Sequence, residues 1–226
     1  LMNKDFELTA DHLNPEKWQD LELPDRWILH RLNGTILRVT KQLESFSFDE
    51  TARSLWDFIW NDFCDWYIEM IKLRLYEGTE TQKQTAMSVA IYVLRDIMKM
   101  LHPYAPFMSE EIWQQVKLAD EPDLIVADWP TVTDAFHAPS EAKETDFLKK
   151  VITAVRTIRS EMNVPPSQGI KLVGRVHSQA QLDILTKTRE TIAKLIRCDE
   201  ITLGLDVEKP GFAASAMVEK MELFIP

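Results

Sequence analysis

The chain has 226 residues, 45% of them hydrophobic and 27% charged, so it can form a sizeable core and is not a disordered segment. Its two cysteines, Cys64 and Cys198, lack the CxxC spacing of a zinc site and are too few for a disulfide scaffold, which fits a reducing, cytoplasmic location. No apolar run approaches the ~18 residues of a membrane helix, and the net charge of −10 disfavours nucleic acid as the default partner.

Four helices are predicted in the first half of the chain. The N-terminal segment shows no clear hydrophobic period, but apolar residues then recur at helical spacing in a helix that starts near Asp25. The same pattern predicts a second helix over about 47–78, a third over about 82–101, and a short fourth helix that starts near Ser109. These helices are expected to form a bundle that spans residues 1–118.

The pattern changes after the bundle. Residues 116–146 hold 2 Lys or Arg against 8 Asp or Glu, and residues 119–145 are therefore predicted to be an acidic surface linker. A small α/β module with a linker helix is expected over residues 146–226, which makes the fold class mainly α. The expected elements are a helix over 146–162, a strand over 170–176, a helix over 179–197, and strands over 200–204 and 216–226.

The stretch WNDFCDWYIEMIK, residues 60–72, raises the question of a reactive site with Cys64 as nucleophile and Asp65 as its partner. On a wheel of 100° per residue, Cys64 lies at the edge of an apolar arc, whereas Asp65 points away from it. Neighbouring residues do not face each other on a helix, so this catalytic couple is geometrically poor. A small buried apolar cysteine is the favoured interpretation.

Ile68 breaks the pattern of the same wheel because it falls on the polar arc, beside Asn61, Asp65 and Lys72. An apolar side chain flanked by an amide, a carboxylate and a cation can receive a nucleobase, whose ring packs on the apolar surface while polar groups contact its edge. The alternative is that another helix covers Ile68. On the residues alone, this covered position is the favoured interpretation.

Four segments of the chain, in this order, resemble the C-terminal part of valyl-tRNA synthetases: DRWILHRLN, WNDFCDWYIEMIKLRL, LHPYAPFMSEEIW and FLKKVITAVRTIRSEMNVPPS. The second and fourth are typical of the valyl enzymes, whereas the third is shared with isoleucyl and leucyl enzymes. The resemblance covers residues 1–226. It implies a helical anticodon-binding domain over 1–118, then a linker helix and a small α/β module. It also implies valine tRNA as the partner, a cytoplasmic location and a monomer.

The resemblance further implies a tRNA-binding fragment of a ligase rather than a complete enzyme. The HIGH and KMSKS signatures of the family's catalytic domain are absent. No catalytic residue, metal site or cofactor is therefore expected in this chain, and ATP belongs to the full-length valine–tRNA ligase with its catalytic and editing domains. The family's first helix, which supplies a Lys, an Arg and a Phe that engage anticodon bases, is represented only by Leu1 to Asn3. The aliphatic residue after FCDWY packs near the anticodon bases in the family, and that position is Ile68 here.

Two stripes of basic residues are candidates for contacts with RNA phosphates, which position a protein without reading sequence. The first helix carries Arg31, Arg38 and Lys41 opposite its apolar face. The helix over 146–162 carries Lys149, Arg156 and Arg159 within about 80° of one another. For any single residue, a solvated helix face is the more ordinary explanation.

Three other functions stay open at the level of sequence. The chain can be the equivalent domain of an isoleucyl- or leucyl-tRNA synthetase, although the run NDFCDWYIE argues against that. It can be a helical protein-interaction module without an RNA role, which the charge of −10 favours. It can also be a hydrolase that uses Cys64, which labelling of the native thiol would test.

Overall fold

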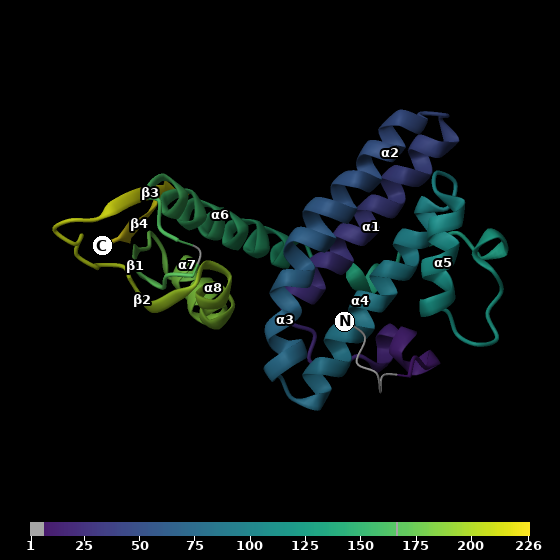
Figure 1. Ribbon diagram of the computed structural model, residues 1–226, viewed down its shortest axis with the longest axis horizontal. Coiled ribbons are helices and arrows are strands. Elements are labelled where there is room, and N and C mark those ends of the chain that lie inside the picture. Colours follow the sequence, from purple (N-terminus) through teal and green to yellow (C-terminus); the bar gives the residue numbers. More distant parts are fainter. Residues whose placement is uncertain (1–6, 166) are drawn as a thin grey trace. The chain divides into compact units, whose positions relative to one another are not determined.

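The computed structural model describes residues 7–165 and 167–226 and divides into two compact units, one up to Ala142 and one from Lys143 onward. The first unit is helical, and the second combines helices with a four-stranded sheet (Figure 1). This confirms the predicted fold class, mainly α with a small α/β module. Leu1 to Asn3, matched above to the end of the family's first helix, lie outside the described residues.

The first unit is built around three long antiparallel helical runs. α1 contacts both α2 and α4, and α3 contacts α4 (Figure 1). α2, a π-helix and α3 follow one another without a break and form one of these runs. The bounds are α1 Leu23–Glu44, α2 Phe48–Trp56, the π-helix Asp57–Tyr67, α3 Ile68–Glu77, α4 Glu80–Leu101 and α5 Pro106–Val116.

The helix starts have local causes. At the start of α4, the backbone N–H of Gln82 donates to the Thr79 hydroxyl, and the side-chain oxygen of Gln82 accepts from the backbone N–H of Thr79. The two residues thus cap the helix reciprocally. α1 begins at Leu23, so Asp25 lies inside the first turn and accepts the Glu22 N–H at 2.9 Å. α5 begins at Pro106 rather than near Ser109, because proline suits the first position of a helix.

One hydrophobic core holds the first unit together. Its members come from the inward faces of α1, the α2–α3 run and α4, with one residue from α5 and two from the segment that follows it. The most deeply buried large side chains of these elements include Trp27, Ile28, Leu29, Leu32, Leu55, Tyr67, Ile71, Ile97, Met100 and Trp113.

Residues 119–142 of the acidic segment belong to the first unit. Leu124 and Phe136 are 3% and 5% exposed and belong to its core. Asn33 on α1 exchanges two hydrogen bonds with the backbone of Thr133, at 2.8 and 3.1 Å. The division between the units therefore falls inside the residues expected to form the linker, at 142/143. Its anchors are single apolar residues at irregular spacing, which leave no helical or strand period in the sequence.

The second unit contains a mixed sheet with the strand order β2-β1-β4-β3. β1 pairs in parallel with β2, through a crossover formed by α7 and α8, and the two remaining pairings are antiparallel. α6 begins at Pro139 and supplies most of its length to this unit. The bounds are α6 Pro139–Glu161, β1 Ile170–Arg175, α7 Gln179–Lys187, α8 Arg189–Ile196, β2 Cys198–Gly204, β3 Ala214–Val218 and β4 Met221–Ile225.

Two predicted elements of this unit are wrong in detail. The single helix expected over 179–197 is two helices that meet at Thr188. The single strand expected over 216–226 is the hairpin β3–β4, in which Val218 faces Met221. Its turn residues, Glu219 and Lys220, both have positive φ, at 47° and 68°. Such two-residue turns usually carry Asn or Gly, and their absence here hid the hairpin.

Candidate nucleic-acid interface

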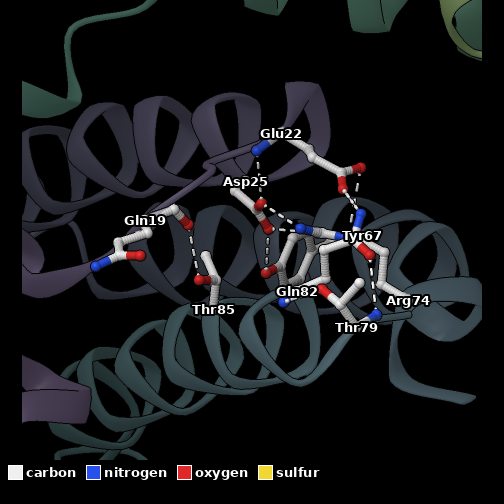
Figure 2. Close-up of polar contacts among 8 residues, drawn as sticks. All are labelled: Gln19, Glu22, Asp25, Tyr67, Arg74, Thr79, Gln82 and Thr85. Atoms are coloured by element: carbon white, nitrogen blue, oxygen red, sulfur yellow. Dashed lines mark hydrogen bonds and ion pairs between the residues drawn. The ribbon is translucent and has the colours of Figure 1, made fainter.

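A buried polar network fixes the position of α3 against α1 (Figure 2). The guanidinium of Arg74 donates two hydrogen bonds of 2.7 Å to the two carboxylate oxygens of Asp25, and the Tyr67 hydroxyl donates a third at 2.9 Å. Asp25 and Tyr67 are fully buried and Arg74 is 6% exposed. Glu22 adds a fourth contact, 3.6 Å from Nε of Arg74.

The electrostatics of this network keep its charges in place. Burial, and then the charge of Asp25, raise the pKa of Tyr67 well above its usual range, so the phenol stays a donor. Burial opposes the charged form of Arg74, but the hydrogen bonds and charge of Asp25 prevail and raise its pKa. A bidentate pair of this kind fixes geometry in two directions. α3 is therefore held against α1 at its start through Tyr67 and in its last turn through Arg74.

The π-helix Asp57–Tyr67 changes which residues face the core. Its hydrogen bonds join residues five apart, which gives roughly 4.4 residues per turn instead of 3.6. The buried positions follow this longer period, at Phe58, Asp62 with Phe63, and Tyr67. The wheel at 100° per residue therefore fails in this segment. At 100° per residue, Phe58 and Asp62 would fall on the solvent side with Asp65, but they are 2% and 5% exposed.

Two exposed tryptophans lie at the start of this segment, where a wheel of 100° per residue would place both on the apolar face: Trp56 ends α2, and Trp60 belongs to the π-helix. Trp56 is 62% exposed and Trp60 is 47% exposed, and their ring centroids are 5.4 Å apart. Exposed aromatic rings are the surfaces on which nucleobases stack. An α-helical period hides this pair, and the i, i+4 spacing of the two tryptophans was the available signal in the sequence.

Ile68 is the first residue of α3 and is half-buried at the margin of the core. Its side chain is less buried than those of the core residues but is not fully exposed to solvent. Because the wheel does not apply across the π-helix, its argument for Ile68 falls away, and the position itself carries the case. Ile68 follows Tyr67 of the buried network, so its backbone is held in place.

The polar residues grouped with Ile68 separate into two sets. Lys72 lies one turn after Ile68 on α3 and forms an ion pair with Glu69. Asn61 and Asp65 are both exposed on the π-helix. The side-chain amide of Asn61 donates to Asp57 at 3.5 Å, at the limit of a hydrogen bond. Ile68 and Lys72 thus share one face of a rigid helix, with Asn61 and Asp65 on the preceding segment.

The basic residues of α1 differ in their surroundings. Nε of Arg31 donates to the buried carboxylate of Asp62 at 2.9 Å, so α1 is tied to the π-helix through this pair. Arg38 and Lys41 are exposed, and neither has an ion-pair partner within the part of the chain that the structure describes. Arg38 and Lys41 are therefore better placed than Arg31 to contact a phosphate.

The three basic residues of α6 belong to the second unit and also differ. Lys149 is half-buried and Arg156 is exposed, with its Nη2 3.2 Å from the carbonyl of Leu195. Arg159 is 8% exposed and donates to four backbone carbonyls. The three residues therefore do not form a stripe of equivalent surface cations: Arg156 is exposed, Lys149 is half-buried and Arg159 is buried.

The chemistry of Cys64 does not favour a nucleophile. Burial, and then the charge of Asp65, raise the pKa of its half-buried thiol. The thiolate is the reactive form, so this environment suppresses reactivity. In residues 7–165 and 167–226, no group of three or more His, Cys, Asp or Glu is placed to hold a metal ion, and no helix has the length and apolar character to cross a membrane.

Comparison with known proteins gives a consistent result. Residues 25–173 match the family of anticodon-binding domains of tRNA ligases. A valine–tRNA ligase of Enterococcus faecalis is 41% identical over 202 residues, which are 89% of this chain and 23% of that protein. Valine–tRNA ligases of Bacillus cereus and Geobacillus stearothermophilus are 39% and 42% identical over 95% and 89% of the chain, which match 25% and 23% of those proteins. The chain therefore spans about a quarter of the length of the curated relatives that it matches.

Proposed function

Because the chain belongs to the family of anticodon-binding domains of tRNA ligases, we propose that it is the anticodon-binding region of a valine–tRNA ligase. In this proposal the helical unit holds the anticodon stem-loop of valine tRNA. The ligation of valine, with ATP, takes place in the catalytic domain of the full-length enzyme, a cytoplasmic monomer. The relatives support a separate catalytic domain, because their chains extend far beyond the region that this chain matches.

The observation that carries the proposal is the placement of Ile68 at the start of α3. A half-buried aliphatic side chain offers an apolar surface to a base, and Lys72 on the next turn can approach the phosphates beside it. The bonds of Asp25 to Arg74 and Tyr67 hold this helix start in place before RNA arrives. A site formed in advance loses less entropy on binding.

The charge of the chain sets the strength and salt dependence of binding. A net charge of −10 repels a polyanion, so the affinity of this chain for the stem-loop is expected to be weak. The attractive contribution comes from a few cations, Arg38 and Lys41 among them, that release counterions from the phosphates. Binding should therefore fall as salt is raised.

The test is a fluorescence-anisotropy titration of this chain with the anticodon stem-loop of valine tRNA and with the same stem carrying a scrambled loop. Ile68→Ala should weaken binding of the cognate loop by about 1–3 kcal/mol, the usual contribution of a stacked base. Ile59→Ala is the matched control, because Ile59 is also half-buried and lies in the same helical run. Equal losses for both variants, or equal affinity for both loops, would contradict the proposal.

A helical protein-interaction module is the second candidate function, and the same net charge of −10 favours it. The exposed pair Trp56 and Trp60 would then contact a protein. This candidate predicts no measurable affinity for either stem-loop at low salt. The titration therefore separates the two functions.

A further inference from the structure

A basic hollow lies in the second unit, between the end of α6 and the end of α8. Its volume is about 540 Å³. Three arginines, one serine and one asparagine line it together with apolar residues, and the lining contains no aspartate or glutamate. The lining residues are Arg156, Arg159, Ser160, Asn163, Val164, Pro165, Leu195, Ile196 and Arg197.

Arg159 forms the buried wall of this hollow. Its Nη1 donates to the carbonyls of Ile196 and Arg197, and its Nη2 donates to those of Pro165 and Gln168, at 2.8 to 3.3 Å. Among the described residues no carboxylate lies within ion-pair distance of it. The four carbonyl dipoles satisfy its N–H groups and offset part of its positive charge, but they supply no neutralising negative charge. A buried cation without a counter-ion is unfavourable, and an anion in the hollow would offset that cost.

The other two arginines are at the mouth of the hollow. Arg156 is exposed on α6, and its hydrogen bond to Leu195 directs the guanidinium towards the end of α8. Arg197 follows α8 in the left-handed conformation, with φ of 49°, and its side chain is exposed. Guanidinium groups match the oxygens of a phosphate in pairs, so two arginines at one opening suit this anion.

We propose that this hollow binds a phosphate of the RNA backbone. The inference rests on the proposed function, and it adds a contact in the second unit that is separate from the anticodon site. The hollow is several times larger than one phosphate group, and its apolar wall of Val164, Pro165 and Leu195 can take the adjoining ribose. The local charge is also favourable, since residues 147–226 carry 12 Lys or Arg against 9 Asp or Glu, unlike the rest of the chain.

The experiment measures binding of the full chain to a short RNA duplex without any loop, which removes anticodon recognition. Arg197→Glu and Arg156→Glu should each weaken duplex binding roughly tenfold at low salt and reduce the slope of log affinity against log salt by about 1. Lys187→Glu is the matched control, because Lys187 is exposed in the same unit, does not line the hollow and undergoes the same change of charge. Equal losses in all three variants would mean that overall charge alone drives binding, which would overturn the proposal.

Thermal melting of each variant checks that it still folds. Because Arg156 and Arg197 are exposed, we expect only a small change in melting temperature. If Arg197→Glu lowers the melting temperature, Arg197→Gln provides the same test without the added negative charge. Titration of the unchanged chain with inorganic phosphate, followed through the arginine side-chain Nε–H signals in NMR, supplies an independent measurement. Shifts confined to Arg156, Arg159 and Arg197, together with duplex binding, support the site. Saturation by inorganic phosphate without any duplex binding would overturn the RNA assignment.

The same variants separate this inference from the proposed function. Arg197→Glu should weaken the duplex and the cognate stem-loop alike, whereas Ile68→Ala should affect only the stem-loop. Loss of the Ile68 effect with retention of the Arg197 effect contradicts the anticodon site and supports the hollow. The reverse pattern overturns the hollow and leaves the anticodon site intact.

Discussion

Replacement of Asp25 by alanine should lower the free energy of unfolding of the helical unit by more than the loss of one small side chain would suggest. Asp25 is fully buried and is the only carboxylate bonded to both Arg74 and Tyr67 among the described residues. Asp25→Ala leaves the guanidinium of Arg74 without its two bonds of 2.7 Å, in a position only 6% exposed. It also leaves the buried Tyr67 hydroxyl without an acceptor.

The magnitude follows from these contacts. Loss of one partner of a buried ion pair costs about 3–5 kcal/mol, because the other charge stays in a medium of low dielectric constant. An unsatisfied hydroxyl adds up to roughly 1–3 kcal/mol, although the two losses are not additive within one network. We expect Asp25→Ala to lower the free energy of unfolding by about 3–5 kcal/mol. The triple variant Asp25→Leu, Arg74→Met and Tyr67→Phe should recover most of it, because apolar groups of similar size can replace a buried pair.

Tryptophan fluorescence during urea denaturation is a selective assay for this effect. All seven tryptophans lie between Trp18 and Trp129, so their emission reports only the first unit. Lys83→Ala, which removes an exposed ion pair with Glu80, is the control and should change stability by about 0–1 kcal/mol. A loss below about 1 kcal/mol for Asp25→Ala, equal to the control, would refute the argument that this network fixes α3.

Three further predictions concern single side chains. Desolvation of the buried Asp96 raises the pKa of its carboxyl despite Lys99, so the folded state binds this proton more tightly than the unfolded state. Compared with the Asp96→Asn variant, the chain should be most stable below the unfolded pKa and should lose that advantage as pH rises through the raised folded pKa. Urea denaturation at a series of pH values across this range measures the difference. In a Cys198→Ser background, Cys64 should react with a disulfide reagent more slowly than an exposed thiol at neutral pH; fast labelling would contradict its raised pKa. Arg159→Leu removes four hydrogen bonds from backbone carbonyls, of which those of Pro165 and Arg197 keep the N–H donors of Gln168 and Ile170. It should destabilise the second unit by about 1.5–3 kcal/mol, seen by circular dichroism as loss of structure without a change in tryptophan emission.

The main features of the fold follow from the sequence because most of its helices have an ordinary period. α1 and α4 place their apolar residues every three or four positions, and the existence of the long helices and of the strands β1 and β2 was predicted. The hairpin β3–β4 was not, because Glu219 and Lys220 adopt positive φ without Asn or Gly. That conformation is imposed by the pairing of the two strands, not by the turn residues themselves.

The candidate interface was predictable only in part. Ile68 as a candidate comes from the resemblance to valyl-tRNA synthetases, and Lys72 comes from its i, i+4 spacing on α3; both stay predictions. The bonds of Asp25 to Tyr67 and Arg74 cross 42 and 49 residues of chain, and no local spacing announces such pairs. The hollow around Arg197 depends on the packing of α6 against α8, which hydrophobic pattern alone does not specify.

The π-helix acts as a change of phase within one continuous helical run. A residue advances by about 100° in an α-helix but only by about 82° in a π-helix, so eleven π-helical residues fall behind by roughly 200°. Everything from Ile68 to Glu77 is thus turned by about half a revolution from where an unbroken α-helix would direct it. Removal of two residues between Asp57 and Tyr67 would allow ordinary α-helical winding with α3 facing the same way. The length of this segment therefore sets the direction of α3 as firmly as its composition does, and related chains that differ there by two residues can present the same face.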